Sequence, residues 1–96
     1  MNGGDIELHD LITDELYKKK SLAAMMWLIT QGRELEASYD GQSFFISCSG
    51  SSKNVSIWIE KEETPFETIE ELVELGEIRG YRIIDVWDKI ELGVLF

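Results

Sequence analysis

Two segments near the start of the chain have the spacing of amphipathic helices. Residues 11–20 can follow an Asp10 cap and end in three lysines, which suit the negative end of a helix dipole. The segment after Ser21 has apolar residues at spacings of three and four, which predicts an inward stripe of Leu22, Met25, Met26 and Ile29. Gly32 stands where helices commonly end. This region forms either one long helix or two shorter ones, and we expect residues 1–9 to be a flexible lead-in.

Alternating apolar and polar residues flank the dipeptide Asp40-Gly41, which is typical of two-residue hairpin turns. A turn of this length pairs Ala37 with Phe44 and Leu35 with Ile46. The two strands then agree on which face is buried.

Residues 55–60 alternate in the same way and predict a third strand. If Cys48 pairs with Val55, Phe45 lies opposite Trp58 on the outward face. Three interpretations stay open: the C-terminal segment or a helix covers this aromatic pair, the pair only stabilises the hairpin, or it binds a partner.

The stretch from Thr64 to Glu67 reads as a capping box with Pro65 at the first helical position, and Gly76 is the expected end of this helix. The buried stripe is predicted to be Phe66, Ile69, Leu72 and Val73. A short helix should follow with Ile83, Val86, Trp87 and Ile90 on one side. It runs into a strand in which Ile90, Leu92, Val94 and Phe96 alternate.

These elements predict an α+β fold. Its order is an N-terminal helix in one or two pieces, a three-stranded antiparallel meander, a capped helix, a short helix and a C-terminal strand. The helices should cover one face of the sheet. With no repeat and no linker in sequence, residues 1–96 are interpreted as a single domain. The position of the last strand in the sheet is left open by the pattern.

The charge of the chain narrows the classes of partner. Nineteen acidic residues against nine basic ones give a net charge of −10. Nucleic acid and anionic membranes are bound through Lys and Arg, so both are disfavoured as direct ligands, and a basic protein is favoured. Cys48 is the single cysteine, which fits a reducing compartment, and we expect a cytoplasmic protein.

Glutamates gather on the helix predicted from Thr64. At about 100° per residue, Glu67, Glu70, Glu71 and Glu74 fall within an arc of roughly 100°. Their mutual repulsion costs on the order of 1 to 2 kcal/mol, which the cap and the helix dipole offset. This face either imitates a run of phosphates for a basic partner or is only a solvated surface.

The sequence has no recognisable catalytic constellation. His9 lies in the expected lead-in and Cys48 within a strand, so a nucleophile and base pair is not expected. A glycine-rich phosphate loop and zinc-ligand spacing are also missing from the sequence. We therefore predict neither an enzyme nor a cofactor or metal site.

The segments that carry a resemblance to other proteins are "ASYDGQSFFIS", "SIWIE", "PFETIEELVELGEIRG" and "IIDVWDKIELGVLF". Through them the chain resembles a loose group of small acidic proteins of Gram-positive bacteria, their phages and mobile elements. The likeness spans residues 21–96 and implies a cytoplasmic accessory protein, without assigning any residue a role.

Two functional hypotheses follow. The first is a non-enzymatic protein-binding module, such as a phage inhibitor that mimics nucleic acid. It would use Glu67, Glu70, Glu71 and Glu74, with Phe45 and Trp58 as an apolar contact. The second is a structural or self-associating homodimeric domain in which Trp27, Phe45 and Trp58 pack against another copy.

Overall fold

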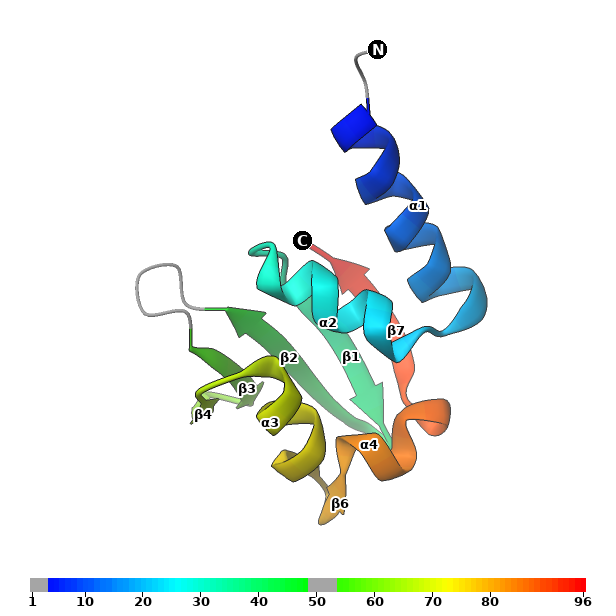
Figure 1. Ribbon diagram of the computed structural model, residues 1–96. Coiled ribbons are helices and arrows are strands. Elements are labelled where there is room, and N and C mark those ends of the chain that lie inside the picture. The colour runs from blue at the N-terminus through cyan, green and yellow to red at the C-terminus, as the bar shows by residue number, and fades with distance from the viewer. Residues whose placement is uncertain (1–3, 49–53) are drawn as a thin grey trace.

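The computed structural model describes residues 4–48 and 54–96, and its first elements are two helices (Figure 1). They are α1 (Gly4–Lys19) and α2 (Leu22–Thr30). Lys20 separates them with a φ of 56°, which a continuous right-handed helix does not contain. Ser21 caps α2, its Oγ accepting a hydrogen bond of 3.1 Å from the backbone N–H of Ala24. The two-helix alternative is therefore the correct one.

Helix α1 begins earlier than the sequence pattern indicates. Residues 4–9, part of the expected lead-in, are helical, whereas residues 1–3 lie outside the described part of the chain. The second half of α1 is anchored to the domain through Leu16, which is fully buried. The first half extends away from the sheet (Figure 1), and Leu8 and Leu11 on it are exposed.

Five strands form one antiparallel sheet in the order β4-β3-β2-β1-β7. They are β1 (Leu35–Tyr39), β2 (Gln42–Cys48), β3 (Val55–Ile59), β4 (Glu62–Phe66) and β7 (Glu91–Leu95). A separate two-stranded ribbon consists of β5 (Glu77–Ile78) and β6 (Tyr81–Arg82). The predicted α+β class is confirmed, but the main sheet has a fourth meander strand that the sequence analysis did not anticipate.

The hairpin prediction is confirmed in register and turn. Leu35 pairs with Ile46 and Ala37 with Phe44. Asp40 and Gly41 both have positive φ, 50° and 82°, as a two-residue turn of this kind requires. The predicted pairings of Cys48 with Val55 and of Phe45 with Trp58 are also present.

The predicted helix start at Thr64 is wrong, because this stretch is strand β4. The chain turns back at Glu60, which has a φ of 58°, and β4 pairs along the whole of β3. Helix α3 (Ile69–Leu75) has Thr68 as its N-cap, four residues later than the predicted cap. Pro65 fits here because β4 is an edge strand, where a missing N–H is tolerated.

The predicted alternation in the last strand is also wrong. Leu35 pairs with Leu95 but Ala37 pairs with Leu92, so β7 has one residue more than β1 between these pairs. This β-bulge turns Leu92 and Leu95 toward the core and leaves Val94 exposed, as is Phe96 after the strand. Strand β7 lies beside β1 at the second edge of the sheet.

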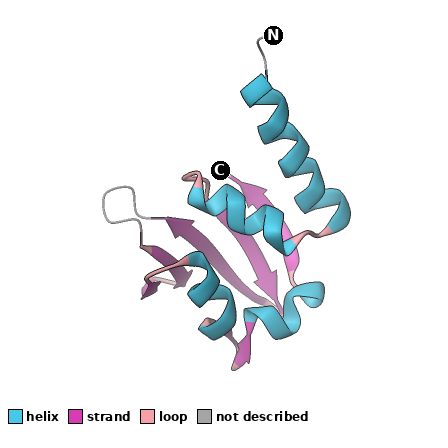
Figure 2. Ribbon diagram, in the orientation of Figure 1, coloured by secondary structure: helices cyan, strands magenta, loops and turns pink. Residues whose placement is uncertain are grey.

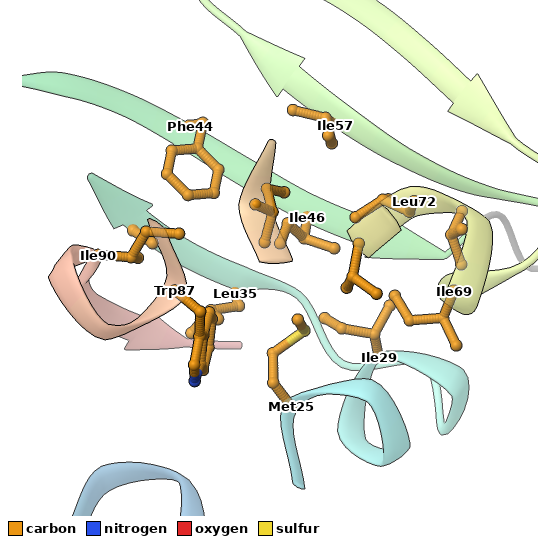
Figure 3. Close-up of a cluster of buried hydrophobic side chains, with 14 of the residues drawn as sticks. Met25, Ile29, Leu35, Phe44, Ile46, Ile57, Ile69, Leu72, Trp87 and Ile90 are labelled. Carbon is orange, nitrogen blue, oxygen red and sulfur yellow. The ribbon is translucent and has the colours of Figure 1, made fainter. Parts of the chain in front are cut away.

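Helices α2, α3 and α4 (Ile83–Val86), followed by the 3₁₀ turn η1 (Trp87–Lys89), cover one face of the sheet (Figure 2). Their apolar side chains meet those of the strands in a single core (Figure 3), whose members include Met25, Ile29, Leu35, Phe44, Ile46, Ile57, Ile69, Leu72, Trp87 and Ile90. The indole N–H of Trp87 donates a hydrogen bond of 2.7 Å to the carbonyl of Lys20, which ties the C-terminal helices to the α1–α2 junction.

Candidate functional site

The outward face of the sheet bears the predicted aromatic pair. Phe45 of β2 lies directly across from Trp58 of β3, and 38% of Phe45 is exposed to solvent. The Trp58 indole N–H donates to Ser47 Oγ at 3.2 Å, which holds the indole beside β2. Helices α2 and α3 cover the opposite face of the sheet (Figure 2).

One expectation was that the C-terminal segment covers this aromatic pair. That segment reaches only the edge of the pair. The ring of Phe96 lies 6.5 Å from the ring of Phe45, with an angle of 43° between the ring planes. Phe96 itself is 59% exposed, so it extends the aromatic surface rather than closing it. Sequence analysis did not place Phe96 here because the pairing of β7 with β1 was not predictable from local pattern.

A shallow groove of about 360 Å³ lies over the aromatic pair. Its lining residues come from both sides of β2: Glu34, Phe45, Ser47, Trp58 and Glu60. The backbone of Glu34 is held by two hydrogen bonds with Phe96, at 2.7 and 3.3 Å, and Glu60 sits in the tight β3–β4 turn. The groove therefore combines two aromatic rings with two carboxylates from ordered backbone, and neither carboxylate was singled out for this place from the sequence.

The four glutamates predicted to share one helical face are separated by the later start of α3. Glu67 precedes the helix, and its backbone N–H donates to Glu71 Oε1 at 3.2 Å. Glu71 is half-buried, and its own N–H donates to the capping Thr68 Oγ1 at 3.0 Å. Glu70 and Glu74 remain exposed one turn apart on α3. The structure thus assigns Glu71 to the helix cap and leaves Glu67, Glu70 and Glu74 at the surface.

Carboxylates between positions 60 and 77 have no cationic partner within the part of the chain that the structure describes. The ion pairs of the described residues involve acidic side chains outside this range: Asp14 with Lys18, Glu15 with Lys19, Asp40 with Arg79, and Asp85 with Arg82. Glu63 instead accepts a hydrogen bond of 2.5 Å from Ser56 Oγ, which satisfies a buried polar side chain on the outward side of β3. The turn, β4 and α3 therefore form a region of negative charge in which Lys61 is the one cationic side chain.

His9 takes part in a side-chain cluster that the sequence analysis missed. An Arg33 guanidinium nitrogen lies 2.6 Å from His9 Nε2, and the imidazole packs edge-on against Trp27 at 5.5 Å between ring centroids. This cluster joins α1, α2 and the loop before β1. The sequence analysis missed this cluster because it placed His9 in a flexible lead-in, where no contacts were expected.

Within residues 4–48 and 54–96, no group of three or more His, Cys, Asp or Glu side chains could hold a metal ion. None of the helices in these ranges has the length and apolar character needed to cross a bilayer.

Comparisons with known proteins give no match to any family model, curated protein or solved structure. The likeness to small acidic proteins of Gram-positive bacteria and their phages stays a prediction from the sequence.

Proposed function

We propose that the protein is a non-enzymatic protein-binding module for a basic partner. The observation that carries this proposal is the negative charge of the turn, β4 and α3, where eight carboxylates stand without an ion pair to any described residue: Glu60, Glu62, Glu63, Glu67, Glu70, Glu71, Glu74 and Glu77. Like charges one turn apart on a helix destabilise it by about 0.2 to 0.5 kcal/mol per pair. The place of Glu70 in the first turn of α3 offsets this repulsion, so stability alone does not explain the pair of Glu70 and Glu74. A basic partner would supply the missing cations.

The narrower form of the proposal is an inhibitor that mimics nucleic acid, of the kind a phage or mobile element would use in the cytoplasm. A surface of carboxylates resembles a row of phosphates in charge and accelerates association with a basic cleft at low salt. The partner would then be a protein that binds DNA or RNA. The partner would then bind either this protein or nucleic acid, but not both at once.

The test is affinity capture with charge-reversal variants, eluted in steps of salt. The double variant Glu70→Lys, Glu74→Lys should lose the partner, because it reverses two charges of the acidic region. Both side chains are exposed, so the variant should still fold. The control is Asp10→Lys, Asp14→Lys, which reverses two exposed carboxylates at the same spacing on α1 and also breaks the exposed ion pair of Asp14 with Lys18. It should retain the partner.

The outcomes of this test are distinct. A partner released from the wild type by moderate salt and displaced by added DNA or RNA supports mimicry. Equal capture by the wild type and the α3 variant would overturn the role of the acidic region. Circular dichroism of both variants checks that each is folded.

A second candidate is self-association through the outward face. The observation in its favour is the contact between the exposed rings of Phe45 and Phe96, with Val94 also exposed two residues before Phe96. Trp27, which was also expected at such an interface, is half-buried against His9 and contributes less. Sedimentation equilibrium over a wide concentration range decides this, because a strict monomer excludes it.

A further inference from the structure

We propose that the groove formed by Glu34, Phe45, Ser47, Trp58 and Glu60 receives an arginine side chain of the partner. The inference rests on the proposed function and names the place and the chemistry of one contact. The groove lies on the outward face of the sheet, whereas Glu70 and Glu74 project from α3, which packs on the other face. The two surfaces can therefore be tested separately.

The aromatic part of the groove suits a cation. Aromatic faces attract guanidinium and ammonium groups through the ring quadrupole, and tryptophan does so best. Here the Trp58 indole is fixed by its hydrogen bond to Ser47, and its N–H is already satisfied. The ring therefore needs no polar partner from the ligand and loses little freedom on binding.

The carboxylates of the groove select the charge of the ligand. Glu34 approaches from the β1 side of β2 and Glu60 from the β3 side, and neither forms an ion pair with a described residue. A purely apolar side chain would desolvate these carboxylates without pairing them, which is unfavourable. An anionic ligand would be repelled. A cation between the aromatic rings and the two carboxylates satisfies both features at once.

Geometry favours arginine over lysine. A guanidinium is planar and carries five N–H donors in a fixed fork, so it can stack on a ring while donating to carboxylates at its edges. An ammonium group is compact, more strongly hydrated and has no plane to stack. A groove lined by aromatic rings and carboxylates therefore suits an arginine side chain better than a lysine side chain.

The probe is an acetylated and amidated peptide, Gly-Ser-Arg-Ser-Gly, titrated into the ¹⁵N-labelled protein at low salt. We expect saturable shifts of the Trp58 indole N–H and the amides of Phe45 and Ser47. The same peptide with citrulline, which is neutral and of nearly the same shape, should give no saturable shift. Glu34→Gln and Glu60→Gln should each weaken binding by about three- to fivefold, as expected for an exposed ion pair. Glu70→Gln should leave it unchanged.

Each contrary result overturns a defined part of the proposals. Shifts confined to α3 overturn the groove as the site but leave the proposed function standing. Equal binding of the citrulline peptide overturns cation recognition, and equal binding of a lysine peptide overturns the choice of arginine. Groove binding of the arginine peptide, together with full retention of the partner by the Glu70→Lys, Glu74→Lys variant, supports the groove and overturns the role of α3.

Discussion

The phenolic hydroxyl of Tyr17 donates a hydrogen bond of 2.6 Å to the backbone carbonyl of Gly93. This bond joins α1 to the outer edge of β7. Nearby, Arg33 Nε donates to the carbonyl of Phe96 at 2.5 Å. The Tyr17 hydroxyl thus satisfies a carbonyl at a sheet edge that could otherwise pair with another strand. At the opposite edge, Pro65 lacks an N–H and β4 bears two carboxylates, and both features disfavour pairing with another strand.

Replacing Tyr17 with phenylalanine should destabilise the protein at neutral pH. The variant keeps the ring but removes the bond to Gly93, and the expected loss in the free energy of unfolding is about 0.5 to 1.5 kcal/mol. Urea denaturation followed by circular dichroism measures it. Tyr81→Phe is the control, because Tyr81 is exposed and its described contact is a ring contact with Tyr39. Equal unfolding midpoints for both variants and the wild type would contradict the role of this bond.

The same tyrosine should make stability depend on alkaline pH. Burial raises the pKa of Tyr17 above 10.0, with the positive charge of Arg33 acting in the opposite direction. Since the folded state holds the proton more tightly than the unfolded state, this contribution is complete below about pH 10 and is lost as pH rises through the folded pKa. Wild type should therefore lose stability faster than Tyr17→Phe as the pH rises above about 10. Parallel denaturation curves for the two proteins over this range would be inconsistent with it.

Gly76 is required for space rather than for backbone conformation. Its φ is −68°, which any residue can adopt, but a Cβ there would collide with the side chain of Ile57 and lie 2.5 Å from the carbonyl oxygen of Leu72. We expect Gly76→Ala to lower the free energy of unfolding by about 1 to 3 kcal/mol through overpacking. In an Ile57→Val background the cost should be smaller, because the colliding methyl is removed. Equal costs in both backgrounds, measured by a double-mutant cycle, would show that Ile57 is not responsible.

Local signals were sufficient where they agreed with one another. Around Asp40-Gly41 the turn chemistry and the alternation on both sides indicate one register, and that register is present. The same register placed Phe45 opposite Trp58, so half of the aromatic groove was predictable from the sequence. Its carboxylates were not, because Glu34 and Glu60 come together only after β1 and β3 are both paired with β2.

Local signals failed where two segments matched one pattern or where pairing was distant. Thr64 and Thr68 each have a glutamate three residues later, and pairing of β4 with β3 decides between them. The turn before β4 begins at Glu60, a residue type that gives no turn signal despite its positive φ. The bulge in β7 depends on β1, which is more than fifty residues earlier in the chain.

The choice between the two capping residues can be tested directly. Thr68→Ala removes the Oγ1 that accepts from Glu71, so it should lower the free energy of unfolding by about 1 kcal/mol. Thr64→Ala changes an exposed position on edge strand β4 and should cost no more than about 0.5 kcal/mol. Thr68→Ser, which keeps a hydroxyl at the cap, should recover most of the loss. Thermal and urea unfolding of the three variants measure these differences. A larger loss in the free energy of unfolding for Thr64→Ala than for Thr68→Ala would favour Thr64 as the helix cap.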